Sequence, residues 1–509
     1  MKTALAYILL LPMLYGHCAC RSYEQQTQKL AGTLPDSTRQ DSTQAADNDS
    51  TAIADSVAEI FGIYEKWTGD WDGMLARRRI RALVVYSKTL YFVDRGERHG
   101  ISFEALKEFE AVLNKQFAQV APTINLVFVP VTRDELLPAL VEGRGDLVAA
   151  NFTITPERLQ MVDFSDPVLA EVSEVVVTAP ASPWLDSLNE LSGKEIHVRA
   201  SSSYYESLLR LNASFLRAGK PPVQIKLADE ILEDEDLLEM TDAGLIPITV
   251  VDSHKARHWQ TVLDSITVHY DLAVNTGGKI AWALRKNSPK LRQVVNAFVQ
   301  KHKAGTLYGN IALRRYLGGA PRLSNATSQQ ERAKFRATIG IFRKYAGRYG
   351  FDWLLLAAQG YQESRLDQSA HSAAGAVGIM QVKPSTARDP SVNIPNIENA
   401  ENNIHAGVKY MRLMMDRHFQ DAQMDTLNKT LFALASYNAG PSRIARLRRE
   451  ARQRNLDPNV WFNQVELVVA RRIGRETVSY VSNIYKYYLS YRLLLEHVQL
   501  QSGRRTHLL

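Results

Sequence analysis

The segment WLLLAAQGYQES, residues 353–364, decides the fold of the last third of this 509-residue chain. It is an apolar run of helical length that ends on the carboxylate of Glu363. Helical patterns recur on both sides of it, and strand patterns nearly vanish after residue 334. We therefore expect a mainly α domain at 335–500, with helices at 335–345, 352–365, 402–418, 426–437, 442–454 and 477–495.

The preceding region, residues 78–318, alternates short apolar runs with amphipathic stretches. Its first lobe is expected to hold strands at 80–85, 126–131 and 147–150, with helices at 103–113 and 134–141. A second set of strands is expected at 174–178, 195–199, 223–227 and 246–251. This order predicts an α/β domain of two lobes with a largely parallel sheet, followed by a linker at 319–334.

The N-terminus has the pattern of an export signal. Lys2 precedes an apolar run at 4–14, which is shorter than the ~20 residues that span a bilayer. The only two cysteines, Cys18 and Cys20, close this segment, so no internal disulfide is expected. A cysteine at this place resembles the lipid-attachment site of bacterial lipoproteins. Cys20, after the small Ala19, is the better acceptor, and ordinary cleavage at 1–20 is the alternative.

Residues 21–77 are expected to form a flexible tether and entry segment, because 21–55 is rich in Ser, Thr, Gln and Asp and lacks apolar periodicity. The formal net charge, 61 basic minus 54 acidic residues or +7, is modest for this length. The late arginines fit solvated helix faces or attraction to an anionic polymer. No nucleic-acid motif is present, and the scattered histidines and terminal cysteines indicate no metal or cofactor site.

Three motifs mark the centre of the α/β region: GRGDLV at 143–148, TITPER at 153–158 and VDFSDP at 162–167. Together they resemble the family-3 periplasmic solute-binding proteins, which bind amino acids and related solutes. The chain departs from that pattern at Val168, where the family usually has Tyr. The resemblance implies that Arg158 grips a ligand carboxylate, that Asp252 holds its amino group, and that the loop at Ser201 supplies backbone donors. An arginine fork suits a carboxylate, although a surface arginine and a helix N-cap at Asp252 are the alternatives.

Four motifs mark the C-terminal region: QES at 362–364, SAAGAVGIMQ at 372–381, ASYNAGP at 435–441 and RETVSYV at 475–481. In this order they resemble the soluble-lytic-transglycosylase family, which has a lysozyme-like fold and cleaves peptidoglycan. Glu363 is then the catalytic residue. A carboxyl delivers a proton near neutral pH only when an apolar setting raises its pKa, and the helix that precedes Glu363 suits this need. No second carboxylate matches the family, and Asp367 is expected to end the helix.

The resemblance also implies substrate-binding residues around Glu363. Ser372 would hold the N-acetyl group or Glu363, and a turn serine is the alternative. Gly378 permits close backbone approach, and Met380 and Gln381 would line the sugar cleft. For Met380, packing in the core is the alternative. The remaining candidates are Tyr437 and Asn438, which would contact the glycan, and Glu476, which would fix the cleft or form a structural salt bridge.

The expected protein is an exported, lipid-anchored lytic transglycosylase on the periplasmic side of the outer membrane. Its partners are peptidoglycan strands, the membrane through the lipid, and a muropeptide or amino-acid ligand that the first domain senses. The alternatives are a catalytically silent solute- or murein-binding lipoprotein and a hydrolytic lysozyme.

Overall fold

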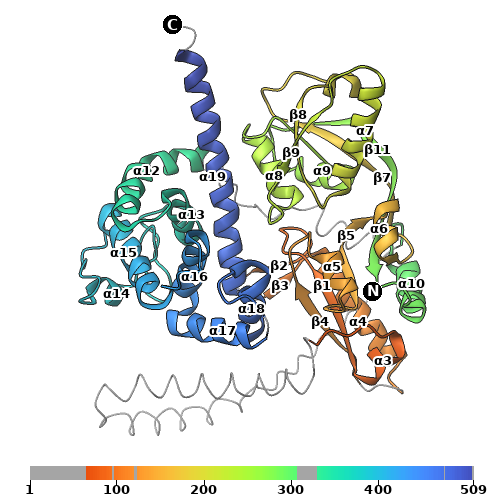
Figure 1. Cartoon of the computed structure of the whole chain (residues 1–509), viewed down its shortest axis with the longest axis horizontal. Coiled ribbons are helices and arrows are strands. Elements are labelled where there is room, and N and C mark those ends of the chain that lie inside the picture. The colour runs from red at the N-terminus through yellow and green to blue at the C-terminus, as the bar shows by residue number, and fades with distance from the viewer. Residues whose placement is uncertain are drawn as a thin grey trace, which may run out of the picture. The chain divides into compact units, whose positions relative to one another are not determined.

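The computed structural model describes residues 65–94, 97–119, 123–306, 329–454, 456–474 and 476–506 (Figure 1). The export signal, Cys18, Cys20, most of the tether and most of the linker lie outside these residues, so what the sequence predicts for them stays a prediction. Within the described part, no helix combines the length and the apolar character needed to cross a bilayer.

The first lobe of the N-terminal domain is built on three parallel strands. The central strand β1 (Arg79–Val84) is buried along its whole length and pairs with β4 (Asn125–Pro130) and β5 (Leu147–Thr153). Helices α4 (Ile101–Gln116), α5 (Leu136–Val141) and α10 (Pro289–His302) belong to this lobe, as do α3 (Trp71–Ala76), α6 (Pro156–Met161), the hairpin of β2 (Phe92–Asp94) and β3 (Glu97–His99), and β6 (Asp163–Phe164).

The second lobe repeats the parallel arrangement with β8 (Glu195–Arg199), β9 (Gln224–Ala228) and β10 (Ile248–Asp252). Its helices are α7 (Ser203–Arg217), α8 (Asp234–Asp242) and α9 (Ser253–Trp259), with a short 3-10 turn at Leu188–Leu191. The strands of both lobes thus fall close to the predicted positions, because each is a buried apolar run.

Two long antiparallel strands join the lobes. The sequence prediction was wrong about both, because it placed only residues 174–178 of the first in a strand and missed the second. β7 runs over Leu169–Thr178 and β11 over Thr267–Leu284, and the resulting nine-stranded sheet has the order β4-β1-β5-β11-β7-β10-β8-β9, with β6 paired to β11. β11 carries Gly277 and Gly278 and several register shifts, which interrupt the apolar alternation that marks a strand in a sequence.

The C-terminal domain is helical throughout its described part (Figure 1). Its helices are α12 (Gln329–Tyr349), α13 (Trp353–Ser364), α14 (Pro384–Arg388), α15 (Ala400–His418), α16 (Thr426–Ala439), α17 (Pro441–Gln453), α18 (Glu466–Arg472) and α19 (Glu476–Thr506). The quoted apolar segment is α13, and its residues 354–361 are all buried. It packs against α12 and α19, so its last turn is held between two other helices.

The ends of α13 explain where the carboxylate lies. Asp352 caps the N-terminus by accepting from the amide of Leu354 at 2.8 Å. At the other end Arg365 and Leu366 both take positive φ, near +57°, which stops the helix directly after Glu363 and Ser364. The helix therefore ends at Ser364, three residues before Asp367, and the expectation that this aspartate ends the helix was wrong.

Candidate active site and ligand site

Glu363 lies in the last turn of α13 in an environment that favours the neutral acid. Burial raises its pKa to about 7, and the hydrogen bond from Tyr480 acts in the opposite direction. The Tyr480 hydroxyl donates to Glu363 Oε1 at 2.6 Å from α19. A carboxyl with a pKa near 7 can both give and take a proton at neutral pH. The geometry therefore suits a group that acts first as an acid and then as a base.

Tyr480 and Gln359 support Glu363, and the sequence reasoning did not single them out. Gln359 is fully buried one helical turn before Glu363, and its Nε2 donates to the Tyr480 hydroxyl at 3.5 Å. Burial, followed by the nearby Glu363 charge, holds the pKa of Tyr480 well above its usual range, so it stays a donor. Two signals were available: Tyr480 lies inside the 475–481 motif, and Gln359 stands at i−4 from Glu363 on the same helix face.

Tyr437 is the second phenol near the acid. Its hydroxyl donates to the carbonyl of Met380 at 2.7 Å, and its ring meets Tyr410 edge-on at 5.6 Å between centroids. Burial raises its pKa, and the charge of Glu363 raises it further, which places the two groups within electrostatic reach. Asn438 is exposed and accepts from the Thr477 hydroxyl at 2.6 Å, so it links the 435–441 motif to the start of α19.

The loop from 372 to 381 is held by hydrogen bonds between side chains and backbone groups. The hydroxyl of Ser372 accepts from the amide of Ala376 at 3.0 Å, and Ser372 is exposed in a turn. Gln381 donates to the carbonyls of Ala370 and Gly378 at 3.2 and 2.9 Å. These bonds agree with the alternative interpretation, in which Ser372 is a serine that stabilises a turn. Its contact with substrate stays a prediction.

Gly378 and Met380 depend on Asn403, which the sequence reasoning also missed. Gly378 has φ +74°, and a Cβ there would lie 2.5 Å from the Asn403 amide nitrogen. Asn403 is fully buried, accepts from the Met380 amide at 2.8 Å and donates to the Val377 carbonyl at 2.8 Å. Met380 is itself fully buried in the core. The structure therefore assigns this glycine and methionine to shaping the loop; whether they also contact the glycan stays a prediction.

The other acidic candidates do not share the environment of Glu363. Asp367 is exposed, and hydrogen bonds from Ser369 lower its pKa. Glu476 is exposed in the first turn of α19, where a carboxylate favours the helix N-terminus. Within the described residues, no other carboxylate influences the pKa of Glu363.

In the N-terminal domain, Arg158 is buried and engaged by groups of the protein itself. It donates to the carbonyls of Thr153 and Ser201, both at 2.8 Å, and its Nε lies 3.6 Å from Glu206. The amide and hydroxyl of Ser201 donate to Glu230 at 3.0 and 2.5 Å. The contacts of Arg158 with Ser201 and Glu206 cross from the first lobe to the second. A ligand carboxylate at Arg158 would have to replace them, and this ligand role stays a prediction.

Asp252 lies at the N-cap position of α9, but its side chain makes no capping bond. Its Oδ2 instead accepts from Asn151 of the first lobe at 3.0 Å and lies 3.3 Å from Lys255. The alternative expectation of a helix cap is therefore not what the side chain does. Asp252 and Arg158 each bond to a residue of the other lobe, and their contact with a ligand stays a prediction.

Comparison with known proteins assigns both domains. Residues 340–459 match the family Transglycosylase SLT domain, and residues 85–318 match Bacterial extracellular solute-binding proteins, family 3. The chain joins a solute-binding domain to an SLT domain. Together with the observed strands and helices, these matches confirm the predicted fold class.

Relatives match the chain over most of its length. It is 28% identical to the membrane-bound lytic murein transglycosylase F of Desulfosudis oleivorans over 454 residues, which are 86% of this chain and 95% of the relative. It is 29% identical to the protein of that name from Pseudomonas putida over 432 residues, 80% of this chain and 84% of the relative. A solved substrate-binding protein of an amino acid ABC transporter is 21% identical, with a TM-score of 0.39, and covers 47% of this chain and 100% of its own.

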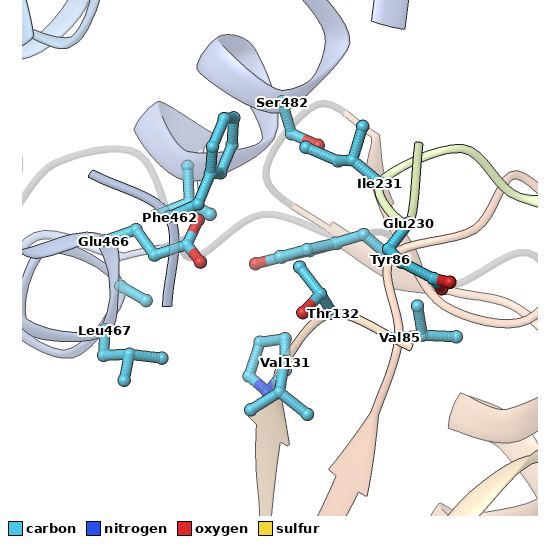
Figure 2. A pocket seen from close by; sticks show the side chains of 13 residues that line it. Val85, Tyr86, Val131, Thr132, Glu230, Ile231, Phe462, Glu466, Leu467 and Ser482 are labelled. Atoms are coloured by element: carbon cyan, nitrogen blue, oxygen red, sulfur yellow. The ribbon is translucent and has the colours of Figure 1, made fainter. Parts of the chain in front are cut away.

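The C-terminal domain contains a buried acid, Glu466, beyond the residues that match the SLT family, at a cavity of about 40 Å³ (Figure 2). Figure 2 shows Glu466 and Tyr86 of the solute-binding domain pointing toward one another across this cavity. Burial raises the pKa of Glu466 to about 7, although its carboxylate accepts from the amide of Asn463 at 2.6 Å. A raised pKa alone therefore does not identify the catalytic acid, and Glu363 is distinguished by its motifs and its phenol donor.

Proposed function

We propose that this chain is a peptidoglycan lytic transglycosylase that cleaves the β-1,4 bond between N-acetylmuramic acid and N-acetylglucosamine. The observation that carries the proposal is Glu363, a buried carboxyl in an SLT domain whose pKa of about 7 lets it work in both directions. Its hydrogen-bond partner, Tyr480, is a neutral phenol and not a cation. The acid is therefore not held in its charged form.

The reaction uses Glu363 twice. Its proton passes to the glycosidic oxygen, the bond from muramic acid C1 to that oxygen breaks, and N-acetylglucosamine leaves as an alcohol. The N-acetyl group of muramic acid stabilises the oxocarbenium-like centre. The Glu363 carboxylate then takes the proton of the C6 hydroxyl, whose oxygen bonds to C1. The product is a 1,6-anhydro end, no water is consumed, and Glu363 returns to its protonated form.

The runner-up activity is hydrolysis, as in a lysozyme. Most glycoside hydrolases place a second carboxylate across the scissile bond, to act as nucleophile or to activate water. Asp367, the nearest candidate in sequence, is exposed and its pKa is lowered, so it supports this chemistry poorly. This contrast favours the route with one carboxylate.

The test is digestion of purified murein sacculi by the full chain, with product masses as the readout. Anhydromuropeptides are expected. Products heavier by one water would identify a hydrolase, and absence of products would identify a binding protein. Glu363→Gln serves as the inactive control and Asp367→Asn as the matched active one.

For the solute-binding domain we propose binding of a cell-wall peptide or amino acid that adjusts cleavage. Support comes from Arg158 and Asp252, which lie at the lobe junction and bond across it. Sacculus turnover is measured with and without added muropeptide, in wild type and in Arg158→Ala. Equal rates in all four assays would contradict this role.

We also propose export and lipid attachment through Cys20, on the periplasmic side of the outer membrane. The relatives named above are called membrane-bound, and the described residues contain no spanning helix. Cys20→Ala is expected to move the protein from the membrane fraction to the soluble fraction, with Cys18→Ala as the control. Unchanged fractionation of Cys20→Ala would contradict the assignment.

A further inference from the structure

A cavity of about 130 Å³ lies at the junction of the two lobes of the solute-binding domain. This volume is several times the ~10–15 Å³ that one water molecule needs, so the cavity can admit part of a small ligand. Its walls are mostly apolar, with contributions from the start of α4, strands β5 and β11, and the end of α10. The apolar lining residues are Leu90, Ile101, Ala105, Ala149, Val168, Leu169, Ile280, Ala281, Trp282, Phe298, Val299 and Ala304.

The second lobe contributes His254 and Lys255 to this cavity, beside Asn151 of the first lobe. These side chains form a network with Asp252. Asn151 donates to Asp252 Oδ2 at 3.0 Å, and the oxygen of the same amide lies 3.1 Å from His254 Nε2. His254 Nε2 is therefore the ring nitrogen that carries the proton, and Nδ1 is left as an acceptor.

Two acceptors in this network have no partner among the described residues: His254 Nδ1 and Asp252 Oδ1. Asp252 is 1% exposed, so water does not compensate its oxygen freely. Buried polar atoms are normally hydrogen-bonded, and an orphan acceptor is satisfied only by a donor. A donor that a ligand brings to the second-lobe wall, such as an amine or amide N–H, would satisfy these acceptors.

The charges of the same wall are already balanced. Lys255 lies 2.5 Å from Asp234 and 3.3 Å from Asp252, and Arg199 lies 2.5 Å from Asp234. Asp234 and Asp252 are thus paired with cations, and the remaining lining is mostly apolar, with the polar side chains of Thr89, Ser102, Asn151, His254 and His302 as the exceptions. A ligand with a net charge, or with a charged side chain, would be desolvated here without a counter-charge.

The small side chain of Val168 leaves part of this cavity open. It lines the cavity at the point where the chain departs from the aromatic residue of the resembling family. Its backbone is fixed on both sides, with its amide bonded to the Ile280 carbonyl at 2.8 Å and its carbonyl to the Ala304 amide at 2.9 Å. A larger side chain at this position would have to enter the cavity.

We propose that this cavity selects a ligand without net charge that joins an apolar body to an N–H donor. The inference rests on the proposed ligand-binding role of this domain and narrows its ligand class. An apolar zwitterionic amino acid and an apolar peptide amide share this chemistry. A basic or acidic amino acid does not.

Isothermal titration of the full chain tests this with three probes: L-leucine, N-acetyl-L-leucinamide and L-arginine. At least one leucine probe is expected to bind, and arginine to bind at least tenfold more weakly. Which leucine probe binds distinguishes a free amine from an amide. Val168→Tyr is expected to weaken leucine-probe binding by about tenfold or more, as overpacking predicts. The matched control, Val141→Tyr, changes a valine of the same lobe that is 45% exposed and should bind as wild type does.

A circular dichroism spectrum and a thermal denaturation midpoint equal to those of wild type show that Val168→Tyr is folded. Arginine binding as tight as leucine, or a Val168→Tyr variant that binds as wild type does, would overturn the inferred ligand class and leave the ligand-binding role intact. Binding of none of the three probes would also overturn it. In that case the muropeptide assay decides the proposed sensing role separately.

Discussion

Burial acts to raise the pKa of two carboxyls, Glu363 of the SLT domain and Asp234 of the solute-binding domain, yet their pKa values shift in opposite directions. The pKa of Glu363 rises to about 7, because burial disfavours its charge and only a phenol offsets it. The pKa of Asp234 falls far below its usual range, because Lys255 and Arg199 outweigh the same desolvation. The presence or absence of cations, and not burial, therefore separates a proton donor from a structural ion.

The same contrast recurs in other pairs of carboxyl groups, although neither region is uniform. The lobes of the solute-binding domain are joined by cation–carboxylate pairs such as Arg133–Glu233, at 2.6 Å, and Lys88–Asp236, at 3.0 Å. In the C-terminal domain, Glu363 and Glu466 accept from donors that carry no charge, Tyr480 and a backbone amide. The same domain also holds ion pairs, such as Arg472–Glu450 at 2.6 Å, and burial raises the pKa of Glu239 in the solute-binding domain to about 7, so the neighbours of each carboxyl decide its charge.

The largest expected effect is on Glu363. Glu363→Gln keeps the shape of the side chain and removes both proton transfers, each typically worth about 10²–10⁴-fold. Sacculus cleavage is expected to fall by about 10⁴-fold or to background, with an unchanged circular dichroism spectrum. Asp367→Asn should retain activity. Comparable losses in both variants would remove the distinction between the two carboxyls.

The second effect concerns stability. Arg199→Met leaves the buried Glu233 and Asp234 short of a cation, and breaking a buried pair of this kind costs about 3–5 kcal/mol. Urea denaturation measures the loss. Lys226→Met removes a half-exposed pair with Glu195 at 3.9 Å and should cost less than about 1 kcal/mol. Equal costs would show that the buried cluster stabilises no more than a surface pair.

The third effect is a shift in pH profile. Cleavage needs protonated Glu363, so wild-type activity is expected to decline as pH rises through about 7. The Tyr480 hydrogen bond lowers that pKa, and Tyr480→Phe should therefore move the alkaline limb to higher pH while reducing kcat by about tenfold. A merely structural tyrosine would not move the limb. The control is Tyr485→Phe. Tyr485 lies on the same helix as Tyr480, and this change removes its 3.4 Å hydrogen bond to Asp229.

The smallest effect tests whether burial without a cation raises the pKa of Glu466. Its pKa is raised from 4.5 to about 7, so the folded state binds more protons than the unfolded state between these values. Wild type should therefore lose stability as pH rises from 4.5 to 7. Glu466→Gln should remove on the order of 1–3 kcal/mol of that loss. Denaturation midpoints at pH 5 and pH 8 measure the slope, with the exposed Glu476→Gln as the control. The same slope in wild type and Glu466→Gln would contradict the raised pKa.

Sequence reasoning located α13, Glu363, most helices and the parallel strands of both lobes. Each of these depends on a local apolar period or on a short motif, which are properties of neighbouring residues. It missed β11, whose glycines and polar residues hide the strand period, and it missed Asn403, whose bonds shape the 378–380 turn. The positions of β11 and Asn403 depend on residues that are distant in the sequence.

The sequence by itself therefore determined the order of the domains and singled out Glu363 as the candidate acid. Only the tertiary structure decided the surroundings of Glu363, because its hydrogen-bond donor, Tyr480, lies 117 positions away on another helix. It likewise decided that Arg158 and Ser201 are engaged by the protein's own groups, and that Asp252 keeps an unpartnered oxygen at the lobe junction. The physical reason is that burial and electrostatic pairing, which set each pKa, arise from residues that meet only when the chain is folded.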